Sequence, residues 1–174
     1  IGTDYRRMSI LDDASDYHYQ ALAASDAYSD KTSTVSIKNR VVSLNGIGNV
    51  QLSLGNSLEA ERVFREALKG ETYLGSYLGQ AINYANIGAL LEERNQLDSA
   101  RIYYAESLRC NQLAGSDLGI SLCHTHFGRL YENEGELDKA ISEYELAYDA
   151  MKDSDDRWHW LESCLCLSRV HHAK

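Results

Sequence analysis

A sequence repeat with a constant step of 40 positions constrains the fold of this chain more than any other feature. The step separates Gly48 from Gly88 and Gly88 from Gly128, and Ser168 follows at the same interval. Four further columns stay in register, at 12, 16, 19 and 20 positions after each glycine. They contain Ala60, Ala100 and Ala140, then Phe64, Tyr104 and Tyr144, then Ala67, Ser107 and Ala147, and finally Leu68, Leu108 and Tyr148. Such self-similarity is typical of repeat architectures, in which each unit packs on its neighbours.

Each repeat contains two segments with the hydrophobic period of an amphipathic helix. In SLEAERVFREALK, apolar residues recur at steps of three and four between Leu58 and Leu68, which predicts a helix with one buried face. The short strings LGN, RNQ and EGE separate the two halves. Their Gly55, Asn95 and Gly135 suit the left-handed conformation that closes a helix. We therefore expect a helix, a tight turn and a second helix in each repeat.

Helix ends must be set without proline, because the chain contains none. Gly75 and Gly115 can end the second helices. Candidate N-terminal caps for the helices that follow are Ser76, Ser116 and, at the third junction, Asp155 or Asp156,. Asn56 with Glu59 resembles a capping box for a second helix.

The glycine in the middle of each first helix needs a packing reason, because it costs about 1 kcal/mol relative to alanine. We expect the missing Cβ at Gly88, for example, to let the partner helix approach closely, with the small Ala100 facing it. A phosphate-binding loop is excluded, because GIGNVQLSLG lacks a preceding strand and a following Lys-Ser/Thr,.

Composition narrows the function further. A net charge of −9 disfavours contact with nucleic-acid phosphates,. Apolar runs are too short for a membrane span, and no signal peptide is visible. Cys110, Cys123, Cys164 and Cys166 do not follow a disulfide or zinc spacing, so reduced thiols are expected,. No nucleophile–base motif is present, so we expect neither an enzyme nor a cofactor.

The columns resemble the tetratricopeptide repeat family. The family's glycine, its two alanines and its aromatic position match Gly88, Ala100, Ser107 and Tyr104, with the same match in the neighbouring repeats. The length of the unit resembles the long-unit subclass found in bacterial regulators and signalling adaptors. The resemblance implies an all-α fold, an α-solenoid of antiparallel helix pairs wound into a right-handed superhelix.

On this basis we expect a single array over residues 1–174. Residues 41–80, 81–120 and 121–160 are the predicted repeats, and 161–174 are a capping or truncated helix. Residues 1–40 are predicted to be a degenerate first unit, with Ala27 and Tyr28 in the columns of Ala67 and Leu68 and Met8 in the glycine column. A loop is expected within YSDKTSTVSIKN, which covers residues 28–39.

The resemblance also implies a concave groove lined by the first helices. The side chains predicted to bind a peptide there are Asn45, Asn49, Glu92, Thr125, Arg129 and Arg169. The asparagines can bracket a peptide backbone, and the two arginines, one repeat apart, can grip a carboxylate. Alternatively, these polar side chains are simply solvated.

The functional hypothesis is a protein- or peptide-binding module, the sensing or scaffolding segment of a larger bacterial signalling protein. The alternative is a structural spacer that associates with itself and has no ligand groove. No metal site is expected from the Cys and His residues, several of which stand in core columns. Free cysteines slightly favour the cytoplasm, while a periplasmic sensor segment stays open.

Overall fold

The computed structural model describes residues 2–27 and 32–173, and for residues 2–10 and 12 it describes the backbone alone. All regular secondary structure in these ranges is helical. The helices are α1 (Gly2–Ala27), α2 (Thr34–Ser53), α3 (Ser57–Leu74), α4 (Tyr77–Glu93), α5 (Leu97–Ala114), α6 (Asp117–Asn133), α7 (Leu137–Met151) and α8 (Arg157–Ala173). The all-α prediction is confirmed.

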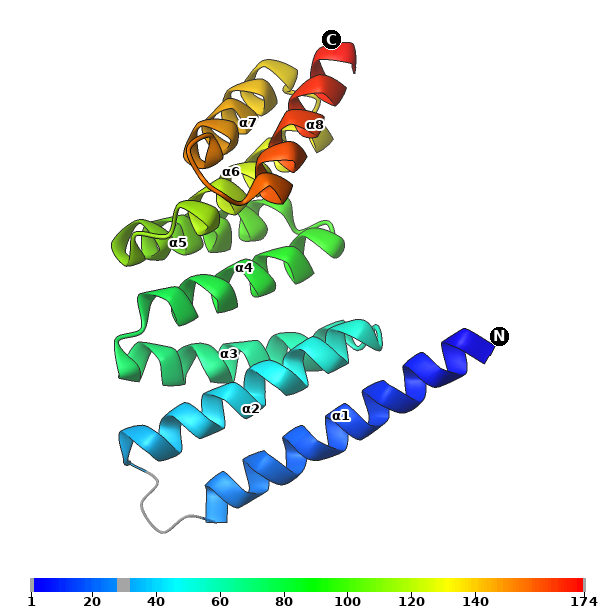
Figure 1. The fold of residues 1–174 in the computed structure, drawn as a ribbon, viewed down its shortest axis with the longest axis vertical. Helices are drawn as coiled ribbons and strands as arrows, with labels where there is room; N and C mark the ends of the chain where they lie inside the picture. Colours follow the sequence, from blue (N-terminus) through cyan, green and yellow to red (C-terminus); the bar gives the residue numbers. More distant parts are fainter. Residues whose placement is uncertain (1, 28–31, 174) are drawn as a thin grey trace.

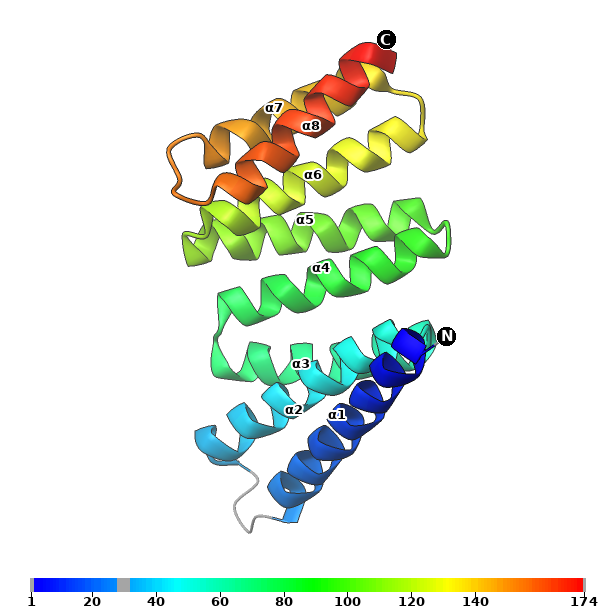
Figure 2. The same ribbon diagram turned by 45° about the vertical axis from the view of Figure 1, so that its right-hand side comes forward.

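Successive helices pack as antiparallel pairs that stack in chain order (Figure 1). The closest pairs are α2 with α3, α4 with α5, and α6 with α7. We refer to α2, α4, α6 and α8 as the first helices and to α3, α5 and α7 as the second helices. In both views α1 and α8 lie at opposite ends of the stack (Figure 2).

The core of each pair is an aromatic ring set against the repeated glycine. Phe64, Tyr104 and Tyr144 are completely buried. A Cβ added at Gly88 would lie 2.7 Å from Cε1 of Tyr104. The expected reason for the glycine therefore needs correction: the missing Cβ makes room for the aromatic ring sixteen positions later, whereas the alanines are not its nearest neighbours.

The helix ends follow most of the predicted signals. The side chains of Ser76, Ser116 and Asp156 each accept a hydrogen bond from the backbone N–H three residues later. Positive φ angles occur at Gly55, Gly75, Gly115, Gly135 and Asn95. The predicted capping box was wrong, because the Asn56 amide donates to Gln51 Oε1 at 2.8 Å and makes no capping hydrogen bond.

The N-terminal segment differs from its expected form. Residues 2–27 make one continuous helix instead of the helix, turn and helix expected of a repeat unit. Within the stretch 28–39, where a loop was expected, α2 already begins at Thr34, capped by Ser33. Residues 28–31, including Tyr28, lie outside the described residues, as does the side chain of Met8.

Helix α1 packs as a second helix, but six residues out of the expected register. The ring of His18 lies against Gly46, and two repeats later the ring of Tyr104 stacks on His126 with centroids 4.4 Å apart. His18 therefore takes the aromatic position. The full pattern Ala14, His18, Ala21 and Leu22 reproduces Ala100, Tyr104, Ser107 and Leu108. In agreement, Leu22 packs against the core of α2 and α3, which places Ala21 rather than Ala27 in the column of Ala67.

Candidate ligand-binding face of the first helices

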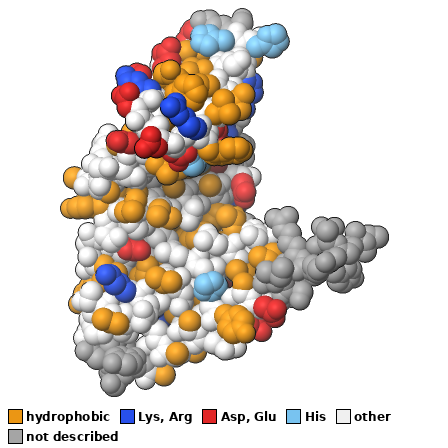
Figure 3. All heavy atoms as spheres, viewed as in Figure 1, with side chains coloured by type: hydrophobic (Ala, Val, Ile, Leu, Met, Phe, Trp, Pro, Cys, Tyr) orange, Lys and Arg blue, Asp and Glu red, His pale blue; other side chains and the backbone are white. Residues whose placement is uncertain are grey.

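The first helices carry exposed apolar side chains in two columns, one member per repeat. The first column contains Val42, Ile82 and Leu122, and the second contains Leu78, Leu118 and Trp158. We call the surface formed by these six residues the first-helix face. Figure 3 shows hydrophobic side chains scattered over the visible side of the stack between its two ends. Apolar residues repeated in this way on a solvent-facing surface favour a binding role.

A groove of about 300 Å³ lies on this face between α4 and α6. Ile82 and Leu122 stand on opposite walls, and Leu78 and Leu118 extend those walls. Its polar lining residues are Asn86 of α4, Ser107 and Asn111 of α5, Ser116 at the N-terminal cap of α6, and His126 of α6. Apolar walls with a few polar groups are the usual composition of a ligand site.

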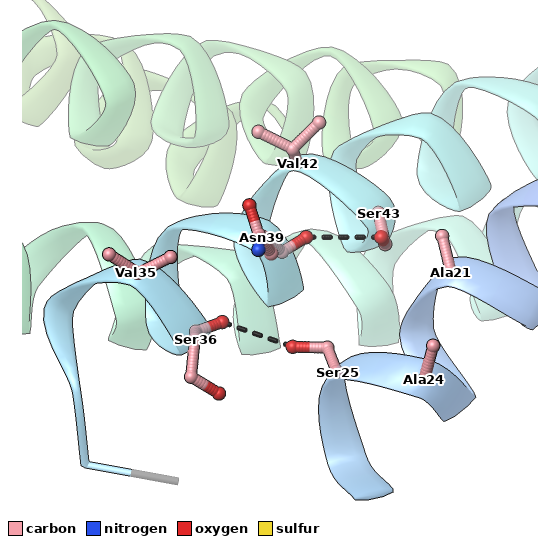
Figure 4. Close-up of a pocket in the computed structure, with 8 residues that line it drawn as sticks. All are labelled: Ala21, Ala24, Ser25, Val35, Ser36, Asn39, Val42 and Ser43. Atoms are coloured by element: carbon pink, nitrogen blue, oxygen red, sulfur yellow. Dashed lines mark hydrogen bonds between the residues drawn. The ribbon is translucent and has the colours of Figure 1, made fainter. Parts of the chain in front are cut away.

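A second groove, of about 520 Å³, lies between α1 and α2 (Figure 4). Six of its residues correspond to residues of the α4–α6 groove by the repeat register and the six-residue shift of α1. The pairs are Ala21 and Ser107, Ser25 and Asn111, Ser36 and Ser116, Asn39 and Gly119, Val42 and Leu122, and Ser43 and Cys123. Ser25 donates to the Ser36 carbonyl at 3.1 Å, and Ser43 donates to the Asn39 carbonyl at 3.0 Å. The same groove thus recurs after two repeats.

Beyond the apolar groove, the C-terminal ends of α4 and α6 hold an ion pair. Arg129 donates from Nε to Glu92 Oε1 at 2.6 Å and from Nη2 to Glu92 Oε2 at 2.7 Å. The hydroxyl of Tyr104, from α5, donates to Glu92 Oε2 at 2.7 Å. One carboxylate therefore joins three helices from two successive repeats.

The same three-residue network recurs one repeat later and is absent one repeat earlier. Glu132 accepts from Arg169 Nη2 at 2.6 Å and from the Tyr144 hydroxyl at 2.5 Å. In the first repeat the corresponding residues are Leu52, Phe64 and Ala89. All three positions thus change together from an apolar set to Glu, Tyr and Arg, as expected if they act as one unit.

Burial and charge set the protonation of this network. Burial alone would raise the pKa of Glu92, but the hydrogen bonds from Arg129 and Tyr104 outweigh it and hold that pKa below its ordinary value,. His126 stacks on Tyr104, and burial together with the Arg129 charge lowers the pKa of His126 to about 4. At neutral pH the network therefore contains an ionised Glu92, a charged Arg129 and a neutral imidazole.

The two predicted carboxylate-binding arginines already have carboxylate partners within the chain. Glu92, also predicted to line the groove, lies against Arg129, and Glu132 lies against Arg169. Within the chain both forks connect neighbouring repeats. A role of Arg129 and Arg169 in holding a ligand carboxylate stays a prediction.

The other predicted site residues are dispersed. Asn45 is half-buried, with an Oδ1 that has no hydrogen-bond partner in the described part of the chain. Asn49 is exposed one turn further along α2. Thr125 donates to the Ser121 carbonyl at 3.0 Å. A role of these residues in peptide binding stays a prediction.

Several residues of the face were not singled out from the sequence. Leu78, Leu118 and Trp158 were not among the predicted site residues, and the structure leaves 75% of Trp158 exposed. The hydroxyls of Tyr104 and Tyr144 were treated as parts of core aromatics. The glutamate and arginine partners of these hydroxyls could have been found from the sequence. Three columns change together from Leu52, Phe64 and Ala89 to Glu, Tyr and Arg in the later repeats.

Within the described ranges, no group of three or more His, Cys, Asp or Glu residues is placed to hold a metal ion. Cys110 and Cys123 are buried, and burial raises the pKa of the Cys123 thiol. None of the helices in these ranges is both long and apolar enough to cross a membrane.

Comparisons with known proteins agree with this architecture. Residues 39–112 and residues 123–153 each match a tetratricopeptide repeat family model. BtubC (BKLC) from P. vanneervenii superimposes with a TM-score of 0.82 at 15% identity, over 97% of this chain and 68% of that one. A Podosopora anserina putative kinesin light chain with nearly identical TPR-like repeats gives 0.70 at 12% identity, over 98% and 82%. No curated protein sequence matches the chain.

Proposed function

This chain belongs to the tetratricopeptide repeat family, and from that membership we propose that it binds a protein or peptide segment through the first-helix face. Modules of this family generally bind other proteins. Repeat arrays do so by presenting an extended surface built from equivalent positions of successive units. Here those positions are the two apolar columns of the first helices.

The observation that carries the proposal is the α4–α6 groove, which places Ile82 opposite Leu122. Both side chains are exposed in the isolated chain. Covering such surface contributes about 25 cal/mol per Å² of apolar area removed from water. A ligand side chain seated between these residues would therefore be apolar, such as leucine or phenylalanine.

The charged end of the face supports an apolar rather than a carboxylate anchor. A carboxylate on the ligand would compete with Glu92 for Arg129, and Glu92 is already held by two arginine bonds and one tyrosine bond. Displacing Glu92 would leave a nearly buried carboxylate without its partner, which is unfavourable. Arg129 and Arg169 thus connect neighbouring repeats.

We further propose that the chain is the sensing or scaffolding segment of a larger bacterial signalling protein. The long repeat unit supports this, by its resemblance to long-unit arrays in regulators. The flanking sequence of the parent gene tests it. An adjacent kinase or DNA-binding domain is the expected result, and a parent with no output domain would contradict it.

Selection from a random peptide library displayed on phage tests the binding proposal. A peptide selected on the immobilised chain should lose about tenfold or more in affinity with Ile82→Glu, because a charge enters the groove wall. Ile102→Glu is the control, since Ile102 is 65% exposed on α5 and does not line the groove. A peptide whose binding is abolished by the Ile102 variant but unchanged by the Ile82 variant would refute the proposed site.

A further inference from the structure

The interval between α2 and α4 lies on the first-helix face, one repeat before the α4–α6 groove. Its walls correspond to those of the groove, because Val42 and Ile82 stand 40 positions before Ile82 and Leu122, and both are more than half exposed. The polar positions of the interval differ from those of the groove. The corresponding residues are Asn45 and Ala85, Glu71 and Asn111, and Asn83 and Cys123. We call Asn45, Glu71 and Asn83 the acceptor site.

The carboxylate of Glu71 has no partner in the part of the chain that the structure describes. The side chain is half-buried, and its carboxylate lies against Gly79 in the first turn of α4, where an added Cβ would overlap it. Within those ranges it takes part in no side-chain hydrogen bond and no ion pair. The site therefore contains a half-buried carboxylate that no cation of the described residues neutralises by direct contact.

Two amide oxygens of the acceptor site are also unpaired. Asn83 is completely buried, and its Nδ2 donates to the Gly79 carbonyl at 2.9 Å, beside the glycine that Glu71 covers. Its Oδ1 has no hydrogen-bond partner among the described residues, and the same holds for Oδ1 of Asn45. These are the two buried side-chain polar atoms of the described ranges that lack a partner. Since buried polar atoms are nearly always paired, their occurrence in one interval indicates that a donor is missing there.

The next repeat shows how the chain supplies that donor elsewhere. There the Asn111 amide donates to Ser107 Oγ at 3.4 Å and to Cys123 Sγ at 3.5 Å. In the acceptor site the equivalent residue is Glu71, and an ionised carboxylate only accepts hydrogen bonds. The donor of the α4–α6 groove is thus replaced by a further acceptor in the α2–α4 interval.

We propose that the acceptor site binds the ammonium group of a lysine side chain of the peptide ligand. This inference rests on the proposed function and adds a basic residue to the apolar one that the α4–α6 groove takes. An ammonium group has three donors and no acceptor, which matches one carboxylate and two amide oxygens. Its methylene stem can lie along the exposed side chains of Val42 and Ile82,. The amide of Asn45 makes no hydrogen bond with the described residues, so it is free to turn towards the ammonium group.

Charge and geometry favour lysine over the other side chains that donate hydrogen bonds. The net charge of −9 favours a basic ligand over a neutral one,. The planar arginine fork carries five donors and would leave some of them unpaired at this site. A purely structural role of Glu71 is the alternative, because a carboxylate beside the first turn of α4 stabilises that helix without any ligand. That role leaves both amide oxygens without a donor.

Nuclear magnetic resonance titration of the full chain with Nα-acetyl-lysine methylamide tests the site without any selected peptide. The side-chain amide signals of Asn45 and Asn83 should shift between about 1 and about 50 mM of this probe. The norleucine analogue, which lacks the ammonium group, should leave them unchanged. Glu71→Gln should abolish the shifts, whereas Glu145→Gln, which removes an exposed carboxylate of α7, should retain them.

The two probes on the parent chain already decide the question if Glu71→Gln does not fold. Equal shifts with the lysine and norleucine probes, or no shift with either, would overturn the proposal and leave Glu71 its structural role. So would shifts that persist in a folded Glu71→Gln variant.

A selected peptide gives the sharper result, because its lysine can be exchanged. Replacing that lysine by norleucine should weaken binding to the parent chain and to Glu145→Gln about tenfold, but binding to Glu71→Gln less than about twofold. Replacing it by arginine should also weaken binding to the parent chain. Equal losses in all three chains, or an arginine peptide that binds as tightly, would overturn the lysine site.

Leu122→Glu separates this inference from the proposed function. Leu122 lies on α6 and lines the α4–α6 groove, so its variant should weaken peptide binding and leave the shifts caused by the lysine probe unchanged. A selected peptide that depends on Leu122 but not on Glu71 would overturn the lysine site alone. If no peptide is selected, the proposed function fails, and the probe titration still decides the lysine site.

Discussion

Replacing Arg129 by alanine tests whether the Glu–Tyr–Arg network stabilises the stack. The Glu92 side chain is only 12% exposed, whereas that of Arg129 is 42% exposed. Breaking a fully buried ion pair costs about 3–5 kcal/mol, and an exposed pair contributes about 0–1 kcal/mol. For this half-exposed pair we expect Arg129→Ala to lower the free energy of unfolding by about 2 kcal/mol. Arg169→Ala should cost less, about 1 kcal/mol, because Arg169 is 60% exposed.

The chain supplies its own reference for removing the whole network. The triple variant Glu92→Leu, Tyr104→Phe, Arg129→Ala recreates the apolar set of the preceding repeat, which is Leu52, Phe64 and Ala89. Because no charge or hydroxyl is then left without a partner, its stability should lie within about 1 kcal/mol of the parent chain. The losses of unfolding free energy in the three single variants should sum to as much as about 5 kcal/mol. Because the triple variant should lose far less than this sum, the effects are expected to be strongly non-additive.

Urea unfolding followed by far-ultraviolet circular dichroism at neutral pH measures these differences. The midpoints of the single variants, the triple variant and the parent chain are compared at an unchanged slope. Additive losses, with the triple variant as unstable as the sum of the single ones, would refute the idea of a coupled network. An Arg129→Ala variant as stable as the parent chain would show that Glu92 does not depend on the arginine.

Three further outcomes follow from the core, the protonation and the helix ends. Gly88→Ala should destabilise the fold by about 1–3 kcal/mol despite the better helix propensity of alanine, because the new Cβ overlaps the buried Tyr104 ring; thermal unfolding measures it. The pKa of His126, lowered to about 4 from 6.5, means that the unfolded chain alone takes up a proton between these values. The free energy of unfolding should therefore be highest above pH 6.5 and fall by up to about 3 kcal/mol towards pH 4. In urea titrations, His126→Asn should reduce this dependence of the unfolding free energy on pH. Ser116→Ala should cost about 1 kcal/mol through loss of the cap, whereas Asn56→Ala, which removes no capping bond, should be nearly neutral in the same assay.

Sequence reasoning was most successful where a structural role depends on local spacing. The constant repeat step located the buried aromatic column, and Ser76, Ser116 and the left-handed glycines marked the helix ends correctly. The helix ends depend on residues within one or two turns of one another, and the aromatic column follows the repeat step, so both patterns are visible in the sequence. The capping box at Asn56 failed because the amide instead bonds Gln51, a choice that the short motif does not determine.

Features that depend on distant contacts were missed or misassigned. Glu92 and Arg129 lie 37 positions apart, and their pairing depends on how two successive first helices pack, so the sequence did not reveal this pair. The register of α1 was missed because a six-residue shift breaks the constant repeat step. A search for the internal pattern of a second helix, without requiring the step of 40 positions, would have found Ala14, His18, Ala21 and Leu22. Exposure of Trp158 and Leu161 likewise depends on which helix covers α8.

Isothermal titration calorimetry tests the proposed binding mode most directly. One selected peptide is measured in two forms, one with a free C-terminal carboxylate and one with an amidated C-terminus. In that mode the first-helix face binds through its apolar groove, while its arginines are held by carboxylates of the chain itself. We predict dissociation constants equal to within about twofold for the two forms. A free acid that binds about tenfold or more tightly, with the advantage lost in Arg129→Met, would contradict it.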